Sequence, residues 1–194
     1  MMGAGKGGER RSGADRREAI DELSRRHAEL WRAYAELAAK LARGQPEVAF
    51  AAAAGALSGS AALDPERGVM LAAAGLESAV ARVLADRLPA GPVEVALQSL
   101  DGDAADPNFV DYTLKDLLRQ GFGREPVGRR GIRVGTWKQI VELLLARSAL
   151  LRAGDRRLYD GFRGDRTTAL AAARDWLEAA RSVVTLLEGW SGRG

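Results

Sequence analysis

Arginines gather in a glycine-rich stretch at residues 119–133, where Glu125 is the only acidic residue beside them. Backbone amides near glycine can approach phosphate closely, and guanidinium groups bind pairs of phosphate oxygens. The glycines and the proline of residues 121–135 favour a long loop, or a small hairpin around residues 128–131. These residue types indicate contact with RNA or a nucleotide, with a merely solvated loop as the alternative. The predicted phosphate-binding residues are Arg119, Arg124, Arg129, Arg130 and Arg133.

A second arginine-rich segment, RRLYDGFRGDR at residues 156–166, lies between two apolar runs. It mixes arginine with aspartate and two aromatic rings. One interpretation is a surface turn whose arginines and aspartates pair locally. The other is a second phosphate-binding segment, with the candidate residues Arg156, Arg157 and Arg163.

The order of a helix, KQIVELLLARSALLRAG, then the 156–166 segment and a long final helix resembles the end of HEPN domains. That helical family includes nucleotide-binding proteins and ribonucleases of prokaryotic defence and toxin systems. An earlier helix with a glutamate among apolar residues, AAAGLESAVARVL, extends the resemblance over residues 64–188. In the family motif an arginine is followed, a few residues later, by a histidine.

The resemblance implies that Arg156 or Arg157 takes the place of the motif arginine. Phe162 or Arg163 stands near the histidine position, so the motif histidine is missing. Arginine does not release its proton near neutral pH and cannot replace an imidazole in acid–base chemistry. The resemblance therefore implies a catalytically degenerate module that binds RNA or a nucleotide, or that partners a toxin-like protein. We expect no catalytic residue, although an enzyme acting on a small molecule remains an alternative.

The remaining inventory of reactive side chains is small. The chain has no cysteine and a single histidine, His27, which excludes thiolate metal sites and zinc sites built on several histidines. The acidic DGDAAD stretch lacks the glycine and glutamate of a calcium loop, because Asp106 and Tyr112 occupy those positions. We therefore predict no metal site and no cofactor. His27 is expected to be a packed, hydrogen-bonded histidine rather than a base or a ligand.

Seven residues on the first long helix repeat with alternating spacings of three and four. Such a heptad seam packs inside a bundle or pairs with a second chain. It supports an alternative function, a structural or adaptor protein that oligomerises or binds a partner through residues 20–41. The heptad seam consists of Ile20, Leu23, His27, Leu30, Tyr34, Leu37 and Leu41.

Helical periodicity accounts for most of the apolar content, so the predicted fold class is an all-α bundle of about five to seven helices. The clearest helix follows Asp64 and Pro65, which are typical of a cap and a first turn. Its alanines and Gly75 permit close helix packing and predict a central position. Residues 91–100 could form a helix or a strand. Residues 1–13 are expected to be a flexible tail, and residues 14–190 a single helical domain.

Charge is distributed unevenly, although the net charge is only +3. Residues 45–110 carry 3 basic and 9 acidic side chains, whereas residues 111–165 carry 12 and 7. This asymmetry predicts a two-faced surface rather than a uniformly basic one. The sequence offers neither a long uncharged apolar run nor the apolar centre of a signal peptide. We therefore expect a cytoplasmic protein that does not contact a membrane. The heptad seam described above favours a homo-oligomer.

Overall fold

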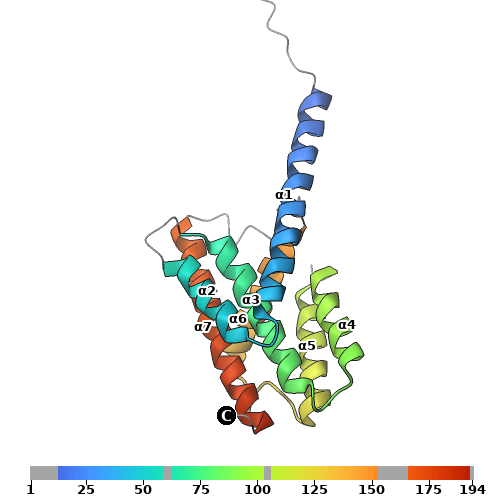
Figure 1. Cartoon of the computed structure of the whole chain (residues 1–194), viewed down its shortest axis with the longest axis vertical. Coiled ribbons are helices and arrows are strands. Elements are labelled where there is room, and N and C mark those ends of the chain that lie inside the picture. The colour runs from blue at the N-terminus through green and yellow to red at the C-terminus, as the bar shows by residue number, and fades with distance from the viewer. Residues whose placement is uncertain (1–12, 59–62, 103–105, 153–165, 193–194) are drawn as a thin grey trace, which may run out of the picture.

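The computed structural model describes residues 13–58, 63–102, 106–152 and 166–192. In these ranges the chain forms seven α-helices and no strand, which confirms the predicted all-α bundle (Figure 1). The helices are α1 (Gly13–Ala42), α2 (Pro46–Ser58), α3 (Pro65–Leu84), α4 (Ala90–Gly102), α5 (Pro107–Phe122), α6 (Val134–Leu151) and α7 (Arg166–Ser191). Among the described residues, no helix combines the length and the apolar composition needed to cross a membrane.

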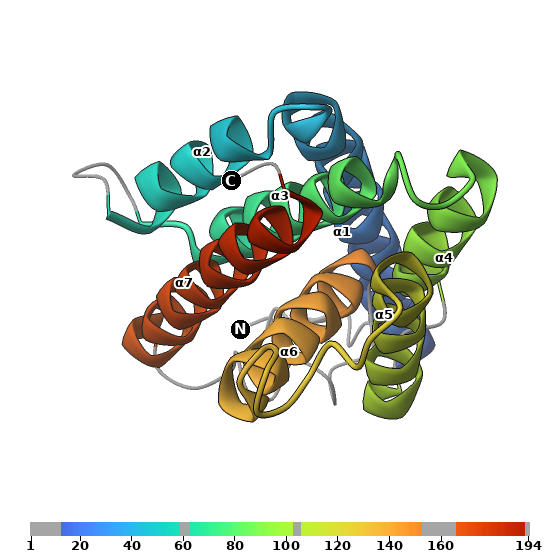
Figure 2. The same ribbon diagram turned by 90° about the horizontal axis from the view of Figure 1, so that it is seen from below.

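Helix α3 lies in the middle of the bundle and contacts α1, α2, α4, α6 and α7 (Figure 2). Most of its apolar side chains are buried, among them Val69, Leu76, Val80 and Val83, as are the alanines at positions 72–74 and 79. A Cβ atom added at Gly75 would lie 2.7 Å from Cε1 of Phe50, and one at Gly68 would lie 2.5 Å from Cδ2 of Leu57. The glycines therefore allow α2 to approach α3 closely, as the sequence predicts.

Local capping explains where several helices begin and end. The backbone N–H of Arg67 donates to Oδ1 of Asp64 at 3.0 Å, which makes Asp64 the predicted N-cap of α3. Asp106, the last residue of the acidic DGDAAD stretch, caps α5 in the same way by accepting from the N–H of Asn108 at 2.9 Å. Helix α5 ends at Gly123, whose φ of 64° is the left-handed conformation that glycine adopts without strain.

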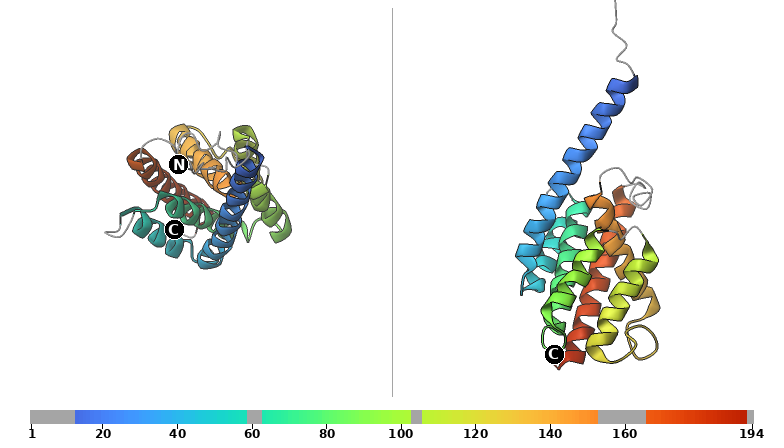
Figure 3. Two further views of the ribbon diagram at one scale, coloured as in Figure 1. Left: turned by 90° about the horizontal axis from the view of Figure 1, so that it is seen from above. Right: turned by 90° about the vertical axis from the view of Figure 1, so that its right-hand side faces the viewer.

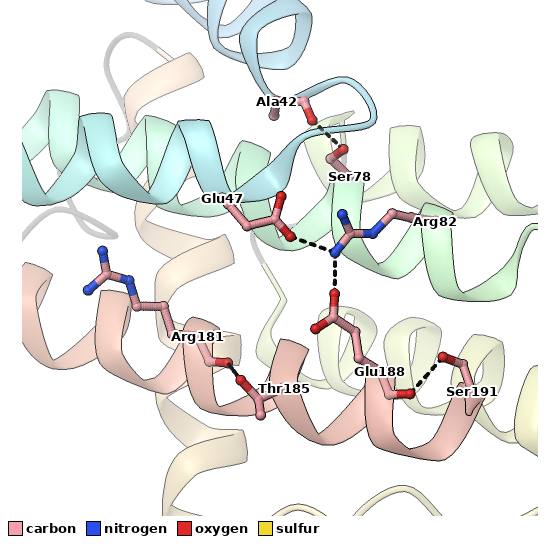
Figure 4. Close-up of polar contacts among 8 residues, drawn as sticks. All are labelled: Ala42, Glu47, Ser78, Arg82, Arg181, Thr185, Glu188 and Ser191. Carbon is pink, nitrogen blue, oxygen red and sulfur yellow. Dashed lines mark hydrogen bonds and ion pairs between the residues drawn. The ribbon is translucent and has the colours of Figure 1, made fainter. Parts of the chain in front are cut away.

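A polar network joins three helices on one side of the core (Figure 4). The guanidinium of Arg82 on α3 forms ion pairs with Glu47 on α2, at 2.7 Å, and with Glu188 on α7. The hydrogen bond from Arg82 lowers the pKa of Glu47. Next to it, the hydroxyl of Ser78 donates to the carbonyl oxygen of Ala42 at 2.6 Å and fixes the end of α1 on α3.

Helices α4, α5 and α6 form the opposite side of the bundle (Figure 2). The ambiguous 91–100 stretch is helical and belongs to α4. The indole N–H of Trp137 on α6 donates to Asp111 on α5 at 2.6 Å, and Lys115 donates to the same carboxylate at 2.9 Å. Burial alone would raise the pKa of Asp111, but these hydrogen bonds outweigh it and lower the pKa.

Candidate functional sites

Six of the seven residues of the heptad seam of α1 are exposed to solvent, and only Tyr34 is half-buried and packs against the core. Leu23, Leu30 and Leu37 are 68 %, 70 % and 61 % exposed, and Ile20 and Leu41 are also exposed. The N-terminal half of α1 extends beyond the other helices, so that part of the seam has no neighbour in the bundle (Figure 1 and Figure 3). The sequence left two arrangements open, packing of the seam inside the bundle and pairing of the seam with a second chain. The structure does not show the first.

A different stripe holds α1 on the bundle. It consists of Ala28, Trp31, Ala35, Ala38 and Ala42, each one position after a member of the heptad seam. Ala28, Ala38 and Ala42 are at most 3 % exposed, and Trp31 and Ala35 pack against the core. We call these five residues the alanine stripe. Small side chains let α1 lie close to α3, which explains why this face is selected over the leucines.

The prediction that the His27 side chain is packed is wrong. The residue is exposed, because the seam to which it belongs is turned away from the bundle. The expected hydrogen bond is present: Nε1 of Trp31 donates to Nε2 of His27 at 3.0 Å. Trp31 also meets the ring of Tyr34 edge to face, and Nε of Arg67 donates to the hydroxyl of Tyr34 at 2.9 Å. His27 thus contributes to a surface aromatic cluster.

A pocket of about 580 Å³ opens between α1, α3, α4 and α6. Its wall contains Arg147 of α6, which is only 3 % exposed, in an ion pair with Glu77 of α3. We call it the Arg147 pocket. Removing one member of a buried ion pair leaves an uncompensated charge, so Arg147 and Glu77 must be retained together. Glu77 is the glutamate within AAAGLESAVARVL, whereas sequence reasoning missed Arg147 altogether.

Further polar and charged groups lie around the same pocket. Arg32 and Glu36 on α1, Gln98 on α4 and Arg152 at the end of α6 line it. Nη2 of Arg152 is buried and has no hydrogen-bond partner among the described residues. An arginine within the apolar run LLLARSALL was the available sequence signal, since a charge amid leucines is costly unless it is paired.

Residues 119–122 form the end of α5, and residues 123–133 form a loop with one isolated bridge between Val127 and Ile132. We call the whole 119–133 stretch the arginine loop. The N–H of Gly128 donates to the carbonyl oxygen of Ile132 at 3.0 Å. The bridge is parallel, so residues 128–131 form a turn within a loop and not the small hairpin that the sequence offered as an alternative. Two of the five arginines have intramolecular partners. Arg119 pairs with Glu125 at 2.5 Å, and Cζ of Arg124 lies 3.6 Å from the ring centroid of Trp190.

The other three arginines of the loop are exposed, and none has an ion pair or side-chain hydrogen bond within the described part of the chain. They are Arg129, Arg130 and Arg133. The remaining predicted residues, Arg156, Arg157 and Arg163, lie outside the described residues. The arginine loop precedes the first residue of α6, and the Arg147 pocket is near its last. A helix of 18 residues is about 27 Å long, so these are two separate sites.

No group of three or more metal-ligating side chains occurs within the ranges that the structure describes. A comparison with known protein families, curated proteins and solved structures finds no match to this chain.

Proposed function

We propose that the protein is a helical interaction module that self-associates by pairing the heptad seam of α1 with the same seam of a second copy. The observation that carries this proposal is the choice of face on α1. The alanine stripe already supplies the contact with the bundle, so the leucines of the seam contribute little to the fold of one chain.

The size of the exposed seam agrees with a reversible dimer. Its five aliphatic residues are between 42 % and 70 % exposed, and burying them would contribute about 4–8 kcal/mol per chain. Association costs about 4–15 kcal/mol in lost freedom of motion, which offsets much of the gain from two chains. We expect a dissociation constant on the order of 10 µM.

A second copy suits the seam better than a charged partner. None of its seven residues is an aspartate, glutamate, lysine or arginine, and the imidazole of His27 already accepts a hydrogen bond from Trp31. A face of this kind matches another apolar heptad face, and identical helices provide one.

The test is sedimentation velocity between 1 and 200 µM, with the charged substitutions Leu30→Glu and Leu37→Glu. We expect the wild-type chain to shift from monomer to dimer, and the double variant to remain monomeric. Both leucines are exposed in the single chain, so the thermal midpoint at low concentration should change little. Val95→Glu is the matched control, because Val95 on α4 is 66 % exposed and lies outside the seam. A wild-type chain that stays monomeric throughout would refute self-association.

As a second function, we propose that the arginine loop binds the phosphate backbone of RNA, as the resemblance to HEPN domains implies. The observation in its favour is the exposure of Arg129, Arg130 and Arg133 without an acidic partner in the described residues. The absence of a histidine from the loop and from residues 156–166 supports binding without cleavage. Retention of a single-stranded RNA by the wild-type chain, lost in Arg129→Gln with Arg130→Gln, would support this function.

A further inference from the structure

We propose that the Arg147 pocket binds a small organic oxyanion. Its phosphate or carboxylate group would be held by Arg152 and Arg32, and its apolar body would lie against α3 and the end of α6. This inference does not depend on self-association or on RNA binding, because it concerns neither the heptad seam nor the arginine loop.

The volume of the pocket is the first support. About 580 Å³ lies within the range of roughly 300–1,000 Å³ that is usual for small-molecule sites. The pocket is formed by residues from four helices that are far apart in the sequence. Such a site accommodates a single small molecule rather than an extended strand of nucleic acid.

The charge of the lining favours an anion. Among the described residues, three arginines and two glutamates line the pocket, which leaves an excess of one positive charge. Arg147 is in an ion pair with Glu77, so the pair is close to neutral and fixed in position. Within the described part of the chain, Glu36 supplies the one further carboxylate of the lining beside Arg32 and Arg152.

Arg152 provides the most direct indication of the ligand. Its Nη2 atom is buried and lacks a hydrogen-bond acceptor among the described residues. A buried donor without an acceptor is unfavourable, and guanidinium groups form their strongest hydrogen bonds with anionic oxygens. An oxyanion at this place would supply the acceptor.

Apart from Gln98, the rest of the wall formed by described residues is apolar. Met70 and Ala74 of α3 and Leu151 of α6 line the pocket, and all three are buried. A thioether side chain adapts its shape to a ligand more readily than a branched one. The ligand is therefore expected to combine one anionic group with an apolar or planar body.

Two probes distinguish the possible anionic groups, and a third lacks the charge. Isothermal titration calorimetry with AMP, octanoate and adenosine would be carried out on the full chain. We expect saturable binding of AMP or of octanoate, and no comparable binding of adenosine. Binding of AMP alone would assign a phosphate, and binding of octanoate alone a carboxylate. If neither anion binds up to 5 mM, or if adenosine binds as tightly as AMP, the proposal is wrong.

Substitutions assign the binding to the pocket. Arg152→Gln should lower the affinity for the anion that binds by about 10-fold or more, because a charge-assisted hydrogen bond is lost. Arg32→Gln, on the exposed side of α1, is a second variant that avoids the buried pair and should weaken binding as well. The control is Arg129→Gln, since Arg129 lies in the arginine loop at the other end of α6. Unchanged affinity in both pocket variants would overturn the assignment.

Discussion

Two glycine-to-alanine substitutions should change stability in opposite directions. In a helix, alanine is favoured over glycine by about 1 kcal/mol because it restricts the unfolded chain. Gly55 lies inside α2, and a Cβ atom there would meet nothing within 4 Å. Gly55→Ala should therefore stabilise the protein by about 0.5–1 kcal/mol.

At Gly75 the same gain is opposed by a collision. The added Cβ atom would lie 2.7 and 2.9 Å from two ring carbons of Phe50, which is itself buried between α2 and α3. Overpacking of a well-packed core costs about 1–3 kcal/mol. The net expectation for Gly75→Ala is a destabilisation of about 1 kcal/mol, or a fall of about 2–4 °C in the thermal midpoint.

Urea unfolding followed by circular dichroism measures both changes. Phe50→Leu removes the ring that the new methyl group would strike, so Gly75→Ala should cost less in the Phe50→Leu background than in the wild type. If Gly75→Ala were as stable as Gly55→Ala, the close contact between α2 and α3 would not limit the packing, and the argument would fail.

Two other predictions concern electrostatics. Lys115→Gln should destabilise the protein by about 0.5 kcal/mol near neutral pH. The pKa of Asp111 is lowered in the folded state, so this contribution is present above the ordinary aspartate pKa of 3.8 and is lost as the pH falls through the folded-state pKa. Urea titrations of both proteins between pH 2 and pH 7 should therefore converge at the acid end, and a constant difference would contradict the assignment. If the three exposed arginines bind single-stranded RNA, a plot of the logarithm of the affinity against the logarithm of the salt concentration should have a slope of about −2. Fluorescence anisotropy measures this slope, the labelled RNA should remain uncleaved, and a flat response would remove the phosphate-binding role.

Much of the fold was predictable from local signals in the sequence. Helical periodicity indicated an all-α bundle, and Asp64 with Pro65 marked the start of α3. Small residues around Gly75 also predicted that α3 would be central, because only small side chains permit close packing on several sides. These features depend on residues within a few turns of one another, and one chain displays them directly.

The orientation of α1 depended on the tertiary structure. Two adjacent stripes run along this helix, one of large apolar residues and one mainly of alanine. Hydrophobicity alone favours burying the leucines, and periodicity does not distinguish stripes that are one residue apart. The bundle binds the alanine stripe because α3 presents a surface that a small-residue face can approach closely.

The composition of the Arg147 pocket was likewise decided by tertiary contacts. The sequence by itself determined the all-α class, most of the helices, the N-cap of α3 and the absence of cysteine. It could not show that Glu77 and Arg147, seventy positions apart, form an ion pair inside the bundle. Nor could it place Arg32 and Arg152 around the same space. Contacts over such separations arise only when the helices pack, and their packing is decided by the shapes of all the facing side chains together.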